Sequence, residues 1–557
     1  MIKPRIIAGT CEFCGIPAYQ CDHYKGLVDI SGKKMFSDDK KSDSSDNIVS
    51  NNFIKTTPEN GKKSNKKILI SCVDFSHLTG MPIYLYNLGR EMIKLGYEIT
   101  LVSTIGGVIS DKAREAGFKL FSWEEDYRDD YIALILNEPI SEQMLERFPD
   151  VPAYNIIHSA RPEDEPIPDC PQIRKYLYSK ASDLAYMKGK VPVDKIDSLP
   201  IPIDFERFSP SKKRPHDVYT ILAPCTLDKL RLPMLKDLVK RACDNPDIKV
   251  ILKGHNYGVI PNPSALPKNV ILDENPEFNI EEIMADCDEV AGILLGTVTI
   301  EAWAMGLKTS VYDLEGNYEM VEQPKDFEII HSAKFIANRL HNFLTEKWAD
   351  IIIPHHDQPD LLAQTLRNIP IRNYNVIIVR GGYFSQSCNK GSKLAETNNL
   401  IFANDDLKIG ARALWEMLDN PADLVGIKQI YPDGSDLCIG IFINEFGNYE
   451  LTSDIKKAIY PSGALFKITR EAWKKVKGFN NGFINGGEDQ DLFLKCIEAG
   501  YSVGFVETPV VHYCSQSTGR FDYIGHNDEL LFKLWTKERL IKTLGDKIKQ
   551  PSDLKNI

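Results

Sequence analysis

The sequence predicts a multidomain α/β protein, and three observations support this fold class. The chain has 557 residues, which at roughly 150 residues per domain corresponds to three or four domains. Hydrophobic residues make up 43% of the chain and charged residues 26%, the composition of ordinary globular domains. From residue 67 onward, apolar strand-like segments alternate with helix-like segments, a pattern typical of parallel sheets covered by helices.

Charge and hydropathy exclude several classes of protein. Lys plus Arg number 67 and Asp plus Glu number 78, so the net charge is −11. This balance argues against a protein that coats duplex DNA by bulk electrostatics and leaves room only for a local basic patch. Apolar runs such as residues 351–354 are far shorter than the ~20 residues of a membrane-spanning helix. The N-terminus lacks a signal peptide's apolar core. We therefore expect a cytoplasmic protein without a membrane span.

Residues 1–30 form a Cys-rich head. It contains the spacing C-x2-C-x6-C-x-H, made by Cys11, Cys14, Cys21 and His23. A C-x2-C turn brings two thiolates to one tetrahedral ion, and mixed Cys and His ligands favour zinc. A head this small also needs a metal because its apolar core is limited. We expect a structural Zn²⁺ site; the alternatives are four unrelated residues or a redox CxxC pair.

Residues 31–66 differ from the rest of the chain in composition. They are rich in Ser, Asp, Lys and Asn and contain few large apolar residues. Such a segment cannot offset the entropy lost on ordering by burying apolar surface. We expect a flexible linker here.

Residues 67–348 contain two α/β halves, at about 67–205 and 216–348. The first half opens with a buried strand, an amphipathic helix that ends near Gly96, and a second strand. This βαβ pattern predicts parallel strands with right-handed crossovers. After a Pro-rich break the same pattern starts again. We therefore expect two facing Rossmann-like domains.

Residues 349–545 form another α/β module, in which polar residues follow apolar strands. The segment NLIFANDDL ends in Asp405 and Asp406, and the strand in VETPVVHY ends in His512. Acids at the carboxyl ends of parallel strands face the usual ligand crevice. Paired acids there suit a divalent cation that carries a diphosphate. An imidazole is able to complete such a metal site.

A second pair of acids lies further along this module. NGGEDQDLFLKCIEAGY places Glu488 and Asp489 at the start of a helix, directly after two glycines. The helix dipole favours ionised acids in the first turn, and a general base must be ionised. Taken singly, Glu-Asp here also suits helix capping, Asn-Asp-Asp suits a turn, and His512 suits a hydrogen-bonded core histidine.

The order and spacing of these segments resemble the family 2 glycosyltransferases, which have the GT-A fold. The resemblance covers roughly residues 349–520, through IIIPHHDQPDLLAQTLRNI, ANDD, LVGIKQIYPDGSDLCIGIFI, YPSGALFKITREAWKKVKGFNNGF and GGEDQDLFLKCIEAGYSVGFVETPVVHYCSQST. It implies an inverting, metal-dependent transfer of a sugar from a nucleotide-sugar donor to an acceptor hydroxyl. At the place where the family commonly carries an acidic pair that reads the nucleobase, this chain has Arg380-Gly381-Gly382. The resemblance therefore does not identify the nucleotide.

The same resemblance implies roles for individual residues. Asp406 and His512 would be ligands of Mn²⁺ or Mg²⁺ on the donor diphosphate, and Asp405 would assist. Asp489 would be the base that deprotonates the acceptor hydroxyl, and Glu488 would bind the acceptor.

The central module resembles GT-B glycosyltransferases close to family 4. SHLTGMPIYLYNLGREMIKLG resembles the first Gly-rich loop and helix, with Gly80 near the donor phosphates. GTVTIEAWAMG resembles the donor-site helix, in which Glu301 would bind the ribose. Lys229 and Arg231 are candidates for diphosphate contacts. The family often has two glutamates separated by seven residues, and Ile293 stands at the place of the first. The module is either a metal-independent, retaining transferase or a scaffold that has lost catalysis.

Three functions agree with these patterns. The leading one is a glycosyltransferase with two modules, one or both of them active. The second is a non-catalytic scaffold that binds sugar or nucleic acid. The third is a glycosyltransferase of modified DNA bases, which the acidic balance and the lack of a recognisable DNA-reading motif weaken. The sequence does not specify the acceptor, whether glycan, protein or nucleic acid, nor the oligomeric state.

Overall fold

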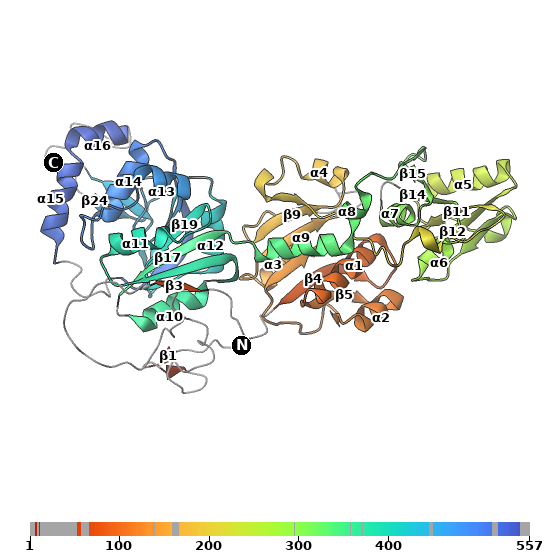
Figure 1. The fold of residues 1–557 in the computed structure, drawn as a ribbon, viewed down its shortest axis with the longest axis horizontal. Coiled ribbons are helices and arrows are strands. Elements are labelled where there is room, and N and C mark those ends of the chain that lie inside the picture. Colours follow the sequence, from red (N-terminus) through yellow and green to blue (C-terminus); the bar gives the residue numbers. More distant parts are fainter. Residues whose placement is uncertain are drawn as a thin grey trace. The chain divides into compact units, whose positions relative to one another are not determined.

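The computed structural model describes residues 66–545 except 138–139, 159–165, 294–295, 357, 370, 445–448 and 515–521. It also gives the backbone of three short strands, β1 (Ile6–Ile7), β2 (Thr10–Cys11) and β3 (Phe53–Thr56). The chain divides into two compact units. We call residues 65–344 the central unit, and residues 1–64 with 345–557 the C-terminal unit. Both are built from sheets covered by helices (Figure 1).

The first half of the central unit is a seven-stranded parallel sheet in the order β10-β9-β8-β7-β4-β5-β6. Its strands are β4 (Lys67–Phe75), β5 (Glu98–Ile105), β6 (Lys119–Phe121), β7 (Ala133–Leu136), β8 (Ala153–Ile157), β9 (Ile173–Tyr178) and β10 (Ile196–Ser198). The helices between them are α1 (Gly80–Lys94), α2 (Gly107–Glu115), α3 (Ser141–Arg147) and α4 (Ala181–Met187). The middle strands are buried on both faces, as expected where helices cover a parallel sheet.

The second half is a six-stranded sheet in the order β13-β12-β11-β14-β15-β16, parallel except at β16. Its strands are β11 (Tyr219–Pro224), β12 (Ile248–Lys253), β13 (Val270–Asp273), β14 (Glu289–Ile293), β15 (Lys308–Tyr312) and β16 (Tyr318–Met320). Its helices are α5 (Leu232–Asp244), α6 (Ile280–Met284), α7 (Thr297–Ala304), α8 (Phe327–His331) and α9 (Ala333–Thr345).

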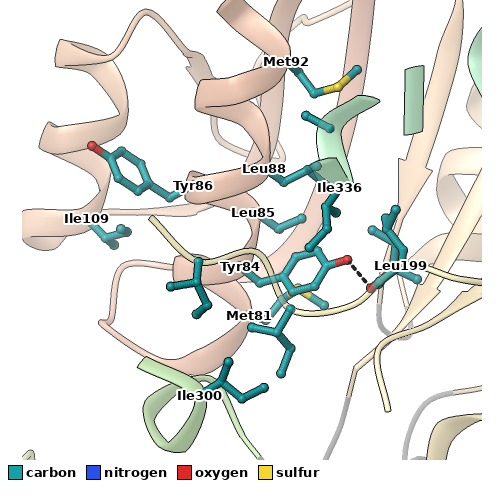
Figure 2. Packing of buried hydrophobic residues seen from close by; sticks show 14 of the residues in the cluster. Met81, Tyr84, Leu85, Tyr86, Leu88, Met92, Ile109, Leu199, Ile300 and Ile336 are labelled. Carbon is teal, nitrogen blue, oxygen red and sulfur yellow. Dashed lines mark hydrogen bonds between the residues drawn. The ribbon is translucent and has the colours of Figure 1, made fainter. Parts of the chain in front are cut away.

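The two halves share one apolar core. Figure 2 shows Met81 and Leu85 of α1 in the same cluster as Ile300 of α7 and Ile336 of α9. α9 returns to the first half, where Phe343 O accepts a hydrogen bond of 2.9 Å from a tyrosine hydroxyl of β8. The cluster therefore ties α1, the first helix of one half, to α7, a helix of the other.

The C-terminal unit contains a mixed sheet in the order β20-β26-β21-β25-β19-β17-β18-β3, with β22 paired to β21. Its strands are β17 (Ala349–His355), β18 (Tyr374–Arg380), β19 (Asn399–Ala403), β20 (Leu407–Lys408), β21 (Leu424–Ile430), β22 (Asp436–Cys438), β25 (Leu465–Thr469) and β26 (Val503–His512). A separate hairpin is formed by β23 (Gly440–Ile443) and β24 (Tyr449–Thr452). The helices are α10 (Pro359–Asn368), α11 (Phe384–Ser392), α12 (Ala411–Asp419), α13 (Arg470–Val476), α14 (Glu488–Glu498), α15 (Ile524–Leu534) and α16 (Lys537–Leu544).

Strand β3 lies inside the segment that we expected to be a flexible linker. It pairs antiparallel with β18, with Phe53 opposite Val379 and Thr56 opposite Val376. The composition argument counted only apolar burial, whereas an edge strand also gains backbone hydrogen bonds from the sheet it joins. Residues 53–56 of the expected linker therefore form an edge strand of this sheet.

Within the part of the chain that the structure describes, no helix combines the length and the apolar character needed to cross a membrane.

Candidate functional site

The loop between β19 and β20 carries Asp405 and Asp406. The apolar strand before it is buried, so the acids begin where the strand ends. The loop is held from two sides: Asn404 N donates to Ala464 O at 2.8 Å, and Thr365 Oγ1 donates to Asp405 O at 2.9 Å. These contacts fix the backbone of the acid loop at the carboxyl end of β19.

The end of β26 brings His512 beside Asp406. β20 pairs with β26 so that Leu407 lies opposite His512, and Tyr513 N donates to Asp406 O at 3.0 Å. As a result His512 Nε2 lies 3.3 Å from Asp406 Oδ1. Asp406 is 7% exposed and His512 5% exposed, yet neither of these two atoms has a hydrogen-bond partner among the described residues.

A buried carboxylate oxygen and a buried imidazole nitrogen that are adjacent and lack hydrogen bonds fit a divalent cation. Burying polar atoms without partners is costly, and a cation would satisfy both atoms at once. Oxygen with imidazole nitrogen is a donor set suited to Mn²⁺ and similar first-row ions. Among the described residues, no group of three or more His, Cys, Asp or Glu side chains is placed to hold a metal. Asp406 and His512 are the two described residues that would hold a cation here.

Asp405 is paired with a different histidine, which the sequence analysis missed. Asp405 Oδ2 lies 2.7 Å from His355 Nδ1. His355 is buried at the end of β17, a strand that pairs with β19. The available signal was PHH at the end of an apolar strand, and only the strand order shows that it meets Asp405.

Asp489 and Glu488 begin α14, as the sequence indicates. Glu488 is buried, while Asp489 is partly buried and its Oδ2 accepts a hydrogen bond of 3.1 Å from Gly463 N. A Cβ at Gly463 would lie 2.4 Å from Asp489 Oδ2, so this approach requires glycine. Ala464, the next residue, accepts the bond from Asn404 described above. One segment therefore contacts both the acid loop and the first turn of α14.

Arg380, Gly381 and Gly382 lie at the end of β18. Both glycines have positive φ, 69° and 82°, and Gly381 N donates to His355 O at 3.2 Å. The turn thus contacts the strand end that carries the partner of Asp405.

In the central unit, Gly80 of α1 faces the second half. A Cβ at Gly80 would lie 3.4 Å from both Thr297 Oγ1 and His158 Cε1. Thr297 is the first residue of α7 and is buried, and its Oγ1 has no hydrogen-bond partner among the described residues. The starts of α1 and α7 therefore meet where the two halves adjoin.

Glu301 lies one turn further along α7 and is only 1% exposed. Burial raises the pKa of Glu301 to about 8, partly offset by the nearby Arg207 guanidinium and reinforced by Glu281. Its Oε2 has no hydrogen-bond partner within the described ranges. Near pH 7 most of the Glu301 carboxyl is therefore protonated. A neutral carboxyl can donate one hydrogen bond and accept another, but it supplies no negative charge.

Lys229 and Arg231 lie in the loop between β11 and α5. Lys229 is exposed. Arg231 forms an ion pair with Asp228, with 2.5 Å between Arg231 Nη1 and Asp228 Oδ2. Part of its charge is thus compensated within its own loop.

The expected zinc head falls largely outside the described residues. Cys14, Cys21 and His23 lie there, and Cys11 is described only as backbone at the end of β2.

Comparison with known proteins associates part of the C-terminal unit with a glycosyltransferase family. Residues 451–526 match the family model described as the N-terminal domain of galactosyltransferase. This stretch includes Gly463, Glu488, Asp489 and His512. No curated protein matches the chain in sequence.

Several solved structures resemble about half of the chain at low identity. A glycosyltransferase from Rickettsia africae is 13% identical and covers 50% of this chain and 93% of its own, with a TM-score of 0.36. HepE from Anabaena in complex with UDP-glucose is 14% identical and covers 50% and 89%, with a TM-score of 0.37. UDP-GlcNAc 2-epimerase from Neisseria meningitidis bound to UDP-GlcNAc is 10% identical and covers 50% and 91%, with a TM-score of 0.35.

Proposed function

We propose that the C-terminal unit is a metal-dependent, inverting glycosyltransferase that moves a sugar from a nucleotide-sugar donor to an acceptor hydroxyl. The observation that carries this proposal is the buried pair of Asp406 Oδ1 and His512 Nε2, 3.3 Å apart and without hydrogen-bond partners in the described residues. The match of residues 451–526 to a galactosyltransferase family model supports the same reaction class.

In this proposal Asp406 and His512 hold Mn²⁺ or Mg²⁺. The cation, when bound, neutralises charge on the donor diphosphate as it leaves. Asp405 lies next to this pair and is oriented by His355, so that it can accept hydrogen bonds from the donor. These residues bind and orient the donor.

Asp489 takes the role of general base. Its carboxylate lies in the first turn of α14, where the helix dipole favours the ionised form. The hydrogen bond from Gly463 N holds Oδ2 in place. Asp489 would accept the proton of the acceptor hydroxyl as that oxygen attacks the anomeric carbon, and Glu488 would help to bind the acceptor. A positioned base typically contributes about 10²–10⁴-fold to the rate.

A panel of nucleotide sugars tests this proposal by thermal shift, with and without Mn²⁺. A ligand that binds only the native state raises the melting temperature. We expect at least one nucleotide sugar to stabilise the C-terminal unit only when Mn²⁺ is present, and then to be hydrolysed or transferred. Binding that is equally strong with excess EDTA would contradict the metal dependence.

The central unit is a second candidate for donor binding. Support comes from Gly80, Thr297 and Glu301, whose helices meet where the two halves adjoin. Helix N-termini with exposed backbone N–H groups suit a diphosphate. We propose that a nucleotide sugar binds there without metal, with Lys229 and Arg231 as further candidates for phosphate contacts. Stabilisation of this unit by a nucleotide sugar in EDTA would support binding, and its absence across the panel would favour a scaffold role.

For the N-terminal head we propose one structural zinc ion per chain, held by Cys11, Cys14, Cys21 and His23. The support is the spacing of these residues. Metal analysis of the purified protein tests it, together with Cys14→Ser. We expect the variant to lose one equivalent of zinc while both α/β units keep their melting temperatures.

A further inference from the structure

Beside His512 lies a buried glutamine to which neither the sequence motifs nor the proposed reaction assigns a role. Gln429 belongs to β21 and is 1% exposed. β21 runs parallel to β26, and the pairing shifts between Ile427 and Gln429, so that Gln429 lies opposite Val510. Successive side chains of a strand alternate between faces, so Gln429 and His512 lie on the same face of the sheet. Irregularities of this kind re-aim side chains near functional sites.

Gln429 contacts both Ser462 and His512 through its side-chain amide. In the structure its Nε2 donates to Ser462 Oγ at 3.0 Å, and its Oε1 lies 2.9 Å from His512 Nδ1. An amide oxygen only accepts hydrogen bonds, so with this orientation of the amide the proton of the second bond belongs to His512 Nδ1. In a neutral imidazole the other nitrogen, Nε2, then has a free lone pair. This is the atom that faces Asp406.

We propose that Gln429 and Ser462 are positioning residues that hold His512 in the tautomer able to bind the cation. This inference rests on the proposed metal-dependent function. It adds two residues to that site which act through His512 and do not touch the ion.

The geometry shows why this tautomer needs support. With the proton on Nε2, His512 would donate a hydrogen bond across the 3.3 Å to Asp406 Oδ1. Asp406 Oδ1 and His512 Nε2 would then be hydrogen-bonded to each other, and neither atom would be available to a cation. The acceptor at Gln429 favours the proton on Nδ1 and keeps both atoms available to the cation. Outer-shell partners of metal-bound histidines typically change metal affinity by about 10–100-fold.

The segment that contains Ser462 also contacts the proposed base. Ser462 is followed by Gly463, whose backbone N–H donates a hydrogen bond to Asp489. This bond does not involve the Gln429 side chain, so removing the Gln429 amide should weaken metal binding and leave the hydrogen bond to Asp489 in place.

The test measures Mn²⁺ binding to the full chain by the EPR signal of free Mn²⁺, at one fixed pH and with UDP present. Gln429→Leu removes the acceptor at similar volume and should weaken Mn²⁺ binding by about 10–100-fold. Gln429→Glu restores an acceptor for Nδ1–H and should bind Mn²⁺ within a few-fold of the unmutated protein. Gln172→Leu is the matched control. Gln172 is buried like Gln429, but it lies in the central unit, where its side-chain amide donates a hydrogen bond of 2.7 Å to the backbone oxygen of Phe148.

The outcomes separate the two proposals. If the unmutated protein and Asp406→Ala bind Mn²⁺ equally, the metal site itself is wrong and this inference falls with it. If Asp406→Ala loses binding but a folded Gln429→Leu keeps the unmutated affinity, only the positioning role is wrong. ¹⁵N NMR of the metal-free, unmutated protein gives a second measurement that needs no variant to fold. We expect the Nδ1–H tautomer at His512, and the Nε2–H tautomer would overturn the inference.

Discussion

The two units each contain a buried carboxylate oxygen without a hydrogen-bond partner in the described residues, but in different surroundings. In the C-terminal unit, Asp406 Oδ1 lies 3.3 Å from His512 Nε2, which also lacks a hydrogen bond. In the central unit, Glu301 Oε2 lacks a hydrogen-bond partner among the described residues, and burial raises the pKa of Glu301 to about 8, against the opposing effect of Arg207.

This difference illustrates two ways in which a protein can accommodate a buried carboxyl group. An isolated buried carboxylate lowers its cost by taking up a proton, which is what the raised pKa of Glu301 means. A carboxylate beside an imidazole nitrogen is instead a pair of potential ligands for a cation. The proposals above therefore assign metal-dependent chemistry to the C-terminal unit and binding by neutral hydrogen bonds to the central unit. The following predictions test this contrast.

The largest expected effect is from Asp406→Ala. This variant removes one of the two proposed protein ligands, so Mn²⁺-dependent binding of a nucleotide diphosphate should be lost. Isothermal titration with UDP, with and without Mn²⁺, measures it. Asp454→Ala, which removes an exposed carboxylate of the same unit, is the matched control and should bind as the unmutated protein does. Equal binding by both variants would remove the distinction between the two units.

The second prediction is that a variant at the proposed base slows sugar transfer without changing the affinity for the donor. Asp489→Asn keeps the shape but removes the base, so transfer should slow by about 10²–10⁴-fold while Mn²⁺-dependent donor binding stays nearly intact. Gly463→Ala should act similarly, because its Cβ would lie 2.4 Å from Asp489 Oδ2 and displace it. Initial rates at saturating donor and the donor Kd measured separately test both variants. Transfer by Asp489→Asn at the unmutated rate would show that another group is the base.

The sequence predicted the alternating α/β pattern well, because buried parallel strands and their crossover helices leave strong apolar periodicity. It also predicted that Asp405, Asp406 and His512 follow strands and that Glu488 and Asp489 begin a helix. The residues that contact these side chains could not be predicted from the sequence in the same way. The contact between Asp405 and His355 depends on strand order, and the contact between His512 and Gln429 depends on an irregular pairing of β21 with β26.

Two further features could not be read from residue types. Glu301 was expected to bind the ribose, and its raised pKa of about 8 follows from burial, which its residue type does not reveal. Strand β3 lies in a segment whose polar composition indicated a linker. It pairs with β18, which comes roughly 320 residues later in the chain, because the edge of a sheet offers unpaired backbone groups to a further strand. Local composition records neither desolvation nor a distant sheet edge.

The third prediction uses the raised pKa of Glu301. The folded state holds this proton up to about pH 8, whereas an unfolded glutamate releases it near its ordinary pKa of 4.5. Between these values the folded state binds more protons, so stability falls as pH rises. From pH 6 to pH 8 the central unit should lose about 2 kcal/mol of unfolding free energy through this group.

Urea unfolding of the unmutated protein and of Glu301→Gln at both pH values measures the effect as a difference. The glutamine carries no titrating proton, so the part of the pH dependence that Glu301 causes should disappear. The same slope in both proteins would mean that Glu301 is ionised in the folded state, as Asp and Glu ordinarily are, and the contrast with Asp406 would then lose its basis.

The smallest expected effect is on donor binding by the central unit. If neutral hydrogen bonds from Glu301 hold the ribose, Glu301→Gln should bind a nucleotide sugar nearly as well as the unmutated protein at pH 7, since an amide also donates and accepts. Glu301→Ala should bind about tenfold more weakly, the effect of losing roughly one buried hydrogen bond. Titration in EDTA, in an Asp406→Ala background, isolates this unit from the metal-dependent one. If Glu301→Gln and Glu301→Ala are equally impaired, the carboxylate charge is what matters, and the two units are more alike than their buried acids indicate.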